Sequence, residues 1–306
     1  MLLKIHLFGS AQARYSDCLL NGFPARQPHQ LLCYLLLNRQ RHHHRERLAN
    51  LFWEDYPTAT SLKYLRDSIW RMRQALQAAG APPNDYIAVD NHSVAFNCNS
   101  NYWLDIETFE AQALRYQDVP AHHLSPEQAA DLEETLQLYT GDLLESVYED
   151  WCLYDRERFR LLHIGMLNKL TNFYEHNGNY QHSLICCRRV LAHNDAREKT
   201  HRQMMRLYWL MGDRESALKQ YERCVEILRD TRDVPPMAET QQLYQQIKQN
   251  REQDSDLSVP PAPPPEAPQA LLSDMLRQVH QLQAAVEHVS AHLATVERRI
   301  EESMRC

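Results

Sequence analysis

Candidate catalytic side chains occur in the sequence, but their spacing does not activate any of them. Asp131, Glu133 and Glu134 offer carboxylates, and His176 or His201 offers a base. General acid–base catalysis needs such groups held together in a defined pair. These residues fall instead in a segment with helical periodicity, where acidic side chains usually form a solvated face. The motifs GxGxxG, GxxxxGK[ST] and HExxH are also absent, so we expect no enzyme and no cofactor.

Two clusters contain residue types that bind metals or change redox state. His42, His43 and His44 are consecutive, so their side chains diverge, and a solvated loop is a simpler interpretation than a metal site. Cys186 and Cys187 point about 100° apart on a helix, which favours buried structural thiols. The eight cysteines include no CxxC pair. We therefore expect no metal and mostly buried, reduced thiols, as in a cytoplasmic protein.

A basic amphipathic segment is the strongest candidate for binding. From Thr60 to Ala79 the apolar positions are spaced 3, 4, 3 and 4, which predicts a helix with one buried stripe (Leu62, Leu65, Ile69, Met72 and Leu76). The opposite face carries donors, an acceptor and aromatic rings: Thr60, Lys63, Tyr64, Asp67, Trp70, Arg71 and Gln74, with Arg66 and Arg73 at its borders. This mixture suits base edges in the major groove of DNA. We expect Arg66 or Arg71 to contact a guanine, and Lys63 and Arg73 to hold phosphates.

The flanking elements predict a winged helix-turn-helix. Residues 2–8 alternate and indicate a strand with Leu3, Ile5 and Leu7 on one face, and a second strand is expected near Cys18–Leu20. Two helices are expected at Gln30–Leu37 and His44–Trp53, the latter with Leu48, Leu51 and Phe52 inward. A hairpin is expected from Tyr86–Val89 and Val94–Phe96. Further candidates for DNA contact at helix starts and at the hairpin tip are Arg26, His29, Arg45, Arg47, Asn91 and His92, and the arginine-poor tip predicts a small contribution.

Charge is distributed unevenly along the 306 residues. The net charge is −7, yet residues 1–80 carry a balance of +6 and the remainder a balance of −13. A basic head on an acidic body favours a polyanionic partner for the head. The longest apolar run, LLCYLLL (31–37), is shorter than the roughly 20 residues of a membrane-spanning helix, so we expect no membrane association.

Residues 105–250 are predicted to be helical and contain an internal repeat. Tyr174, Gly178, Leu184 and Leu191 recur 34 residues later as Tyr208, Gly212, Leu218 and Val225. Thirty-four residues is the period of tetratricopeptide helix pairs, in which a glycine suits the tight turn. Such solenoids usually bind other proteins, so the repeat indicates architecture more strongly than function.

The C-terminal part has a different composition. Residues 251–270 are rich in proline and predict an extended linker. Residues 271–303 then carry a 3-4 heptad spacing, which favours a homo-oligomeric coiled coil, either dimer or trimer, over a helix that packs on the solenoid. Its seam comprises Leu272, Met275, Val279, Leu282, Val286, Val289, Leu293, Val296 and Ile300.

Residues 2–250 resemble the Streptomyces antibiotic regulatory protein family, an OmpR-like winged helix followed by a bacterial transcriptional activator domain. The resemblance rests on LLCYLLL, RERLANLFW (45–53), LRDSIWRMRQAL (65–76), LYTGDLLESVYEDWCLYDRERFR (138–160), MGDRESALKQYERCVEIL and VPPMAETQQLY (234–244). His42–His44 departs from the family pattern, which leaves the short strand and helix cap there in doubt.

The expected fold is mainly α: a winged helix-turn-helix at 1–100, a tetratricopeptide-like solenoid at 101–250, a linker at 251–270 and a coiled coil at 271–303. The resemblance implies a cytoplasmic, DNA-binding transcription activator that contacts RNA polymerase through the turn containing Glu54, Asp55 and Tyr56. One alternative is a tetratricopeptide scaffold whose winged helix docks protein, and another is a sensor whose solenoid holds a ligand. Binding to DNA, unlike either alternative, should weaken steeply as salt rises.

Overall fold

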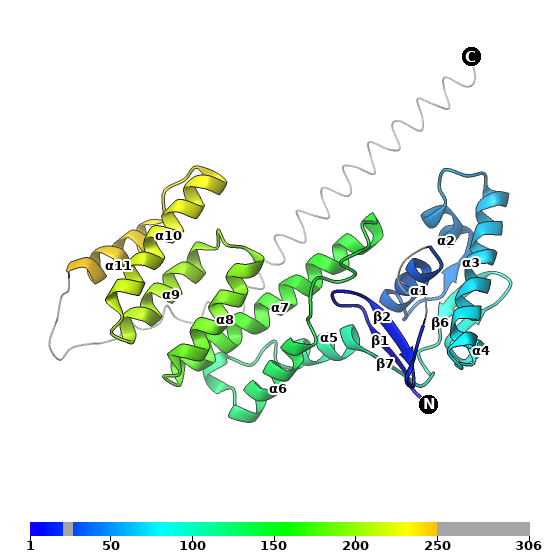
Figure 1. The fold of residues 1–306 in the computed structure, drawn as a ribbon, viewed down its shortest axis with the longest axis horizontal. Coiled ribbons are helices and arrows are strands. Elements are labelled where there is room, and N and C mark those ends of the chain that lie inside the picture. Colours follow the sequence, from blue (N-terminus) through cyan, green and yellow to red (C-terminus); the bar gives the residue numbers. More distant parts are fainter. Residues whose placement is uncertain (21–26, 250–306) are drawn as a thin grey trace, which may run out of the picture. The chain divides into compact units, whose positions relative to one another are not determined.

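The computed structural model describes residues 1–20 and 27–249, which belong to one unit. Arg26, the proline-rich linker and the heptad seam lie outside the described residues. The first sheet contains β1 (Leu3–His6), β2 (Gln12–Tyr15), β3 (Cys18–Leu19) and β7 (Tyr102–Leu104) in the order β3-β2-β1-β7 (Figure 1). The predicted strands at residues 2–8 and near Cys18 are confirmed, while β2 and β7 were not predicted. β7 pairs in parallel with β1, so the chain returns to its first strand after about a hundred residues.

The winged helix follows the predicted order of three helices and a hairpin. Its helices are α1 (Gln27–Leu37), α2 (Arg45–Phe52) and α3 (Thr58–Ala78), followed by the short α4 (Pro83–Tyr86). The wing consists of β5 (Ile87–Val89) and β6 (Ser93–Phe96), and β4 (His43–His44) pairs with β6 in a second sheet of order β4-β6-β5.

Two local predictions in the winged helix are wrong. The histidine run is not a solvated loop, because His43 is 8% exposed and its Nε2 lies 3.2 Å from the Asn38 carbonyl oxygen. The strand that the histidines put in doubt is present as β4. Leu51 does not face inward: it is 41% exposed, and Ala49 is buried beside Leu48.

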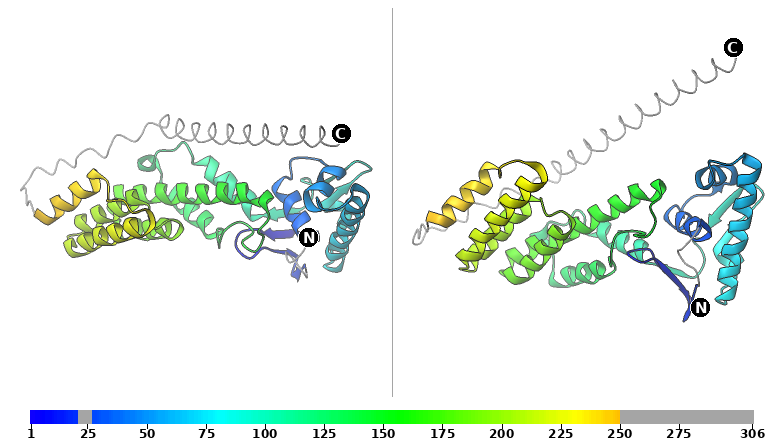
Figure 2. Two further views of the ribbon diagram at one scale, coloured as in Figure 1. Left: turned by 90° about the horizontal axis from the view of Figure 1, so that it is seen from above. Right: turned by 45° about the horizontal axis from the view of Figure 1, so that its top comes forward.

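The remainder of the unit is helical, as predicted. It contains α5 (Asp105–Arg115), a 3-10 turn (Ala121–His123), α6 (Pro126–Gln137), α7 (Asp150–His176), α8 (Tyr180–His193), α9 (Glu198–Leu210), α10 (Arg214–Arg232) and α11 (Ala238–Gln249). Helices α7 to α11 stack in chain order (Figure 2). Within the described residues no helix is long and apolar enough to cross a membrane.

The 34-residue repeat is confirmed as two equivalent helical hairpins. Gly178 joins α7 to α8 with φ +72°, and Gly212 joins α9 to α10 with φ +78°. The following residues, Asn179 and Asp213, cap α8 and α10 by accepting a backbone N–H three residues later. A positive φ strains any residue with a Cβ, which explains why glycine occupies both turns.

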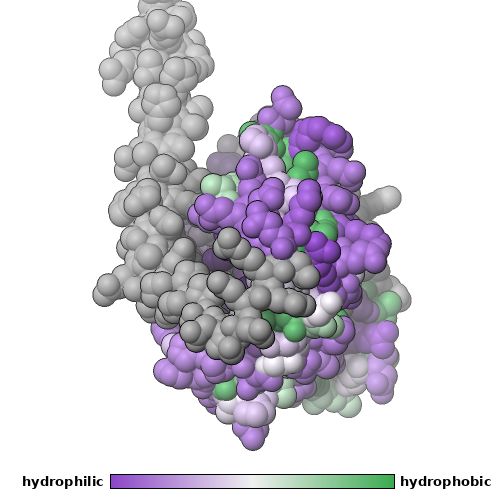
Figure 3. Space-filling view, turned by 90° about the vertical axis from the view of Figure 1, so that its left-hand side faces the viewer, coloured by the Kyte–Doolittle hydropathy of each residue, from purple (hydrophilic) through white to green (hydrophobic). Residues whose placement is uncertain are grey.

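One hydrophobic core runs through both the winged helix and the first helical hairpins. The Phe8 ring lies 5.0 Å from that of Phe109 and 5.4 Å from that of Phe159, and the buried cluster extends from Leu3 to Val190. Cys186 and Cys187 are buried, as predicted, and burial raises their thiol pKa values to about 11 and about 12. The face of the molecule in Figure 3 is mostly hydrophilic with scattered apolar residues.

Candidate nucleic-acid interface

The turn between α2 and α3 fixes where α3 begins. The buried Ser61 hydroxyl donates to the Trp53 carbonyl at 2.9 Å and also lies near the Tyr56 and Pro57 carbonyls. The Trp53 indole N–H donates to the Gln27 side-chain oxygen at 3.0 Å, which ties the turn to α1. Because these bonds hold the start of α3, the direction in which its outer face points is set by the core.

The buried stripe of α3 agrees with the prediction. Leu65, Ile69, Met72 and Leu76 are buried, together with two serines, and Leu62 is partly buried against the same core. Helix α3 lies at the end of the unit remote from α8–α11 in all three ribbon views (Figures 1 and 2). Its outer face is therefore not covered by the helical domain.

Most of the α3 residues predicted for DNA contact are exposed on this outer face. The exposed residues are Lys63, Arg66, Asp67, Trp70, Arg71 and Gln74. No ion pair or hydrogen bond within the described residues uses the side chains of Lys63, Arg66 or Arg71. Trp70 is 62% exposed. Three uncompensated cations and an exposed indole on one helical face are what a polyanion with apolar base edges would contact.

Three residues of the predicted face, Thr60, Tyr64 and Arg73, are partly buried. Tyr64 is partly buried, and its ring packs edge-on against Tyr56 at 5.2 Å. Arg73 is also partly buried and donates from Nη2 to the Ile87 carbonyl at 3.3 Å, which links α3 to the wing. Both side chains are therefore partly committed to the fold of the winged helix.

The wing tip is organised around a carboxylate. Asp90 accepts the backbone N–H groups of His92 at 2.7 Å and Ser93 at 2.6 Å, and the Ser93 hydroxyl at 2.7 Å. These hydrogen bonds lower the pKa of Asp90 to about 2, so the tip carries a negative charge. Arg45 donates from Nη1 to the Asp90 carbonyl at 3.2 Å. Asn91 and His92 are exposed beside this carboxylate, which would be repelled by phosphates.

The remaining candidates lie at helix starts and in the α2–α3 turn. Arg47 is exposed on α2. His29 is partly buried on α1, and burial lowers its pKa, which favours a neutral imidazole over a phosphate-binding cation. Glu54, Asp55 and Tyr56 are all exposed in the turn, as a protein-contact surface requires.

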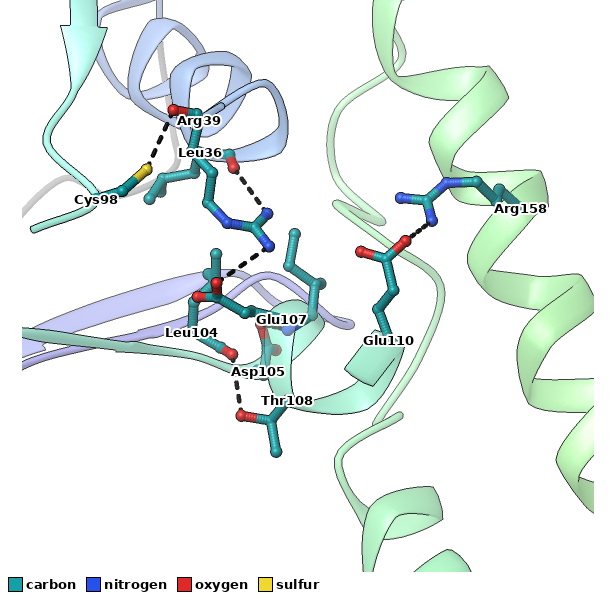
Figure 4. Close-up of polar contacts among 10 residues, drawn as sticks. Leu36, Arg39, Cys98, Leu104, Asp105, Glu107, Thr108, Glu110 and Arg158 are labelled. Carbon is teal, nitrogen blue, oxygen red and sulfur yellow. Dashed lines mark hydrogen bonds and ion pairs between the residues drawn. The ribbon is translucent and has the colours of Figure 1, made fainter. Parts of the chain in front are cut away.

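The end of β1 is fastened to the helical domain by Asp105, a residue that was not singled out from the sequence. Its carboxylate is completely buried at the start of α5 and accepts the backbone N–H groups of Leu7 at 2.8 Å and Phe8 at 3.0 Å. Burial raises the pKa of Asp105 to about 6. Figure 4 shows this junction, in which Arg39 of the winged helix pairs with Glu107 of α5 at 3.4 Å, and Arg158 of α7 pairs with Glu110.

The segment after α6 closes over the same end of β1. The Leu144 N–H donates to the Leu7 carbonyl at 2.8 Å, and the Gly9 N–H donates to the Asp142 carbonyl at 2.8 Å. A Cβ on Gly141 would lie 3.0 Å from the Gly9 Cα, so a side chain there would push against backbone. The LYTGDLL motif therefore contains the glycine that lets the two chains approach.

Arg156 of the DRERFR motif holds this segment from the other side. Its guanidinium donates from Nε to the Leu143 carbonyl at 2.8 Å, and from Nη2 to the Leu144 carbonyl at 2.8 Å and the Val147 carbonyl at 2.5 Å. The neighbouring Trp151 packs edge-on against Tyr34 of α1 at 5.5 Å. These residues, which carry the family resemblance, join the helical domain to the winged helix.

Three of the residues considered as catalysts, Asp131, Glu133 and His201, have structural partners. Asp131 accepts the Tyr116 hydroxyl at 2.7 Å, and Glu133 accepts the Tyr174 hydroxyl at 2.6 Å. His201 is completely buried between the Asp195 carbonyl and Gln220, each 2.6 Å away. Among the described residues, no group of three metal-ligating side chains comes together.

Comparison with known proteins gives a match to a domain family and a similar solved structure. Residues 104–248 match the bacterial transcriptional activator domain. A structure of Mycobacterium tuberculosis EmbR, in complex with a low-affinity phosphopeptide, superposes with a TM-score of 0.59 at 18% identity over 92% of this chain and 71% of that chain. No curated protein matches the chain.

A winged helix joined through a shared core to a bacterial transcriptional activator domain defines a transcriptional regulator. The matched domain is the one that the resemblance in the motifs implies, and it supports a regulator of the Streptomyces antibiotic regulatory protein type.

Proposed function

We propose that the chain is a sequence-specific DNA-binding transcription activator whose α3 reads the major groove. The observation that carries this proposal is the outer face of α3, which presents Lys63, Arg66 and Arg71 without internal partners beside an exposed indole. A solvated face needs no exposed tryptophan, and a protein-docking face is usually depleted of charge at its centre. The same face offers cations for phosphates and both donors and acceptors for base edges.

Individual residues take different roles in this proposal. Arg66 or Arg71 donates to a guanine, Lys63 holds a phosphate, and Tyr64, Asp67, Trp70 and Gln74 lie along the groove. Arg45, Arg47 and the described His29 lie toward the flanking backbone. Arg73 keeps one N–H on the wing carbonyl and has further N–H groups for a phosphate. Asn91 and His92 contribute little because the Asp90 carboxylate stands beside them.

DNA binding by two arginine variants tests the proposal. Duplexes selected from a random pool by the full chain would be titrated with Arg66→Ala and Arg71→Ala. Each variant should lose about 1–3 kcal/mol of affinity for the selected site if its contact is a bidentate one to a base. Lys63→Ala should weaken binding to all duplexes similarly and reduce the salt dependence. Unchanged affinity in both arginine variants would refute α3 as the recognition helix, and salt-insensitive binding would favour the protein-docking alternative.

We propose that the turn between α2 and α3 contacts RNA polymerase and in this way mediates activation. Glu54, Asp55 and Tyr56 are exposed next to the recognition helix, so a protein bound there would stand beside the promoter. In a transcription assay with the purified polymerase of the source bacterium, the double variant Glu54→Ala, Asp55→Ala should bind its site normally and fail to activate. Full activation by this variant would place the polymerase contact elsewhere.

We also propose that the chain self-associates through residues 271–303, which lie outside the described residues. Two linked winged helices would bind neighbouring half-sites with a high effective concentration. Light scattering should give a dimer or trimer for the full chain and a monomer for residues 1–255. Monomers in both samples at tens of micromolar would refute the proposed coiled coil. We place these steps in the cytoplasm, where the DNA is.

A further inference from the structure

The exposed tryptophan on α3 is unusual within this molecule. All five tryptophans are described, and the other four are buried or partly buried, whereas Trp70 is 62% exposed. An indole is the largest apolar side chain and is highly buried on average. Trp70 also has no ring partner among the described residues. The side chain therefore has a large contact surface that the fold leaves unused.

The neighbours of Trp70 indicate which part of a duplex it would meet. At about 100° per residue, Asp67 and Gln74 lie within about 60° of Trp70 on one side around the helix, and Arg66 lies about 40° away on the other side. Lys63 lies two turns earlier at nearly the same angle as Trp70, and Arg71 lies about 100° away. We call Asp67, Trp70 and Gln74 the central band of α3. A carboxylate in this band would be repelled by phosphates, but over base edges it accepts the cytosine amino group. The cations keep the roles proposed above, a phosphate for Lys63 and a guanine for Arg66 or Arg71.

The chemistry of the major groove limits which group of a base pair Trp70 could contact. The 5-methyl group of thymine is the one apolar group that base pairs present there. Because the indole is largely apolar and sits in a band directed at bases, we propose that Trp70 contacts a thymine methyl and makes that thymine part of the recognised sequence. This inference rests on the proposed DNA-binding function and names one feature of its operator.

Removing only the methyl group provides the test. The full chain would first select a duplex from a random pool, and each thymine in that duplex would then be replaced singly by deoxyuridine, which keeps its base pairing. The wild-type chain should lose about fourfold in affinity at one thymine per half-site, as expected for one buried methyl-sized group. Trp70→Ala should bind the thymine and deoxyuridine duplexes equally well.

Matched variants separate the methyl contact from a general weakening. Gln74→Ala lies in the same band and should lose affinity while keeping the fourfold preference for thymine. Trp70→Phe, which keeps an aromatic ring, should retain part of the preference. A thermal melt of Trp70→Ala that matches the wild type would show that the change acts at the surface.

The outcomes distinguish this inference from the proposed function. Selection of a specific site at which no thymine is sensitive to loss of its methyl would overturn the inference alone. The same holds if Trp70→Ala keeps the wild-type preference, or if it weakens binding at a methyl-insensitive site, as an indole inserted between base pairs would. Failure of the wild-type chain to select any sequence would overturn the proposed function together with the inference.

Discussion

The outer face of α3 and the junction between the winged helix and the helical domain use charged residues in opposite ways. Arg71 is exposed and has no partner among the described residues, whereas Arg156 donates to three backbone carbonyls. The junction also uses Asp105, which is completely buried. The motif residues of the junction therefore make contacts within the fold, while the exposed residues of α3 remain available to bind a partner. Resemblance in the junction motifs therefore identifies the architecture and says little about which DNA sequence is read.

A matched pair of arginine variants tests this contrast with the largest expected effect. Arg156→Ala should lower the free energy of unfolding by about 3 kcal/mol or more, since it leaves several carbonyls without a charged donor. Arg71→Ala should change it by less than about 0.5 kcal/mol, as surface substitutions do. Urea denaturation of the two variants of the full chain measures both. Equal losses of stability would erase the distinction between the two regions.

Acid should destabilise the fold through His163, a buried residue of α7, whereas α3 contains no histidine. His163 stacks on Tyr139 with ring centroids 4.1 Å apart, and burial lowers its pKa to about 3. The unfolded chain then binds a proton that the folded chain does not, so stability falls as the pH drops below about 6.5. Between pH 6.5 and 5 this one group should cost about 1.5–2 kcal/mol.

The pH dependence of His163→Gln isolates that contribution. Asp105 acts in the opposite sense, because its raised pKa makes the folded chain bind a proton first as the pH falls below about 6. The informative quantity is therefore the difference between wild type and variant, measured by urea denaturation at each pH, with His92→Gln as a surface control. If the free energy of unfolding depended on pH identically in wild type and His163→Gln, the lowered pKa assigned to His163 would be contradicted.

The two repeat turns should respond alike to substitution, with a smaller effect. Gly178→Val and Gly212→Val should each destabilise by about 1–2 kcal/mol, because both positions have positive φ and no neighbouring atoms crowd a Cβ. DNA specificity should not change. The thermal melts should use the full chain rather than residues 105–250, because Phe8 is part of the same core. A variant with undiminished stability would contradict the equivalence of the turns.

The smallest expected effect is at the wing. Asn91→Ala and His92→Ala should each change DNA affinity by less than about 0.5 kcal/mol, the range of peripheral substitutions, because the Asp90 carboxylate keeps phosphates away. The same titrations used for the α3 variants measure this. A tenfold loss in either variant would show that the wing, and not only α3, positions the duplex.

Periodicity predicted most of the helical architecture, and failed where long-range contacts decide. The stripe of α3 and the 34-residue repeat are local patterns, and both were found. β7 has three residues and is formed by pairing with β1, so its own sequence gives little signal. The exposure of Leu51 and the burial of His43 depend on which neighbours pack against them.

The same limit applies to the candidate site. Helical spacing gives the direction of a side chain from α3, and it placed the exposed residues of the outer face correctly. It gives no information about other segments that approach the helix. Tyr64 meets Tyr56 of the turn, and Arg73 meets the Ile87 carbonyl of the wing. The role of the buried Asp105 carboxylate also could not be predicted, because its partners are about a hundred residues earlier in the chain.

The fastening of β1 by Asp105 bears on how such regulators could be re-engineered. Exchanging the first hundred residues for those of another regulator would cut β1 from β7 and leave the Asp105 carboxylate facing a foreign backbone. A chimera made at that boundary should express poorly even if both parents are stable. Retargeting would instead require grafting a few outward side chains of α3 onto the intact chain, which preserves the joint and changes only the surface that faces DNA.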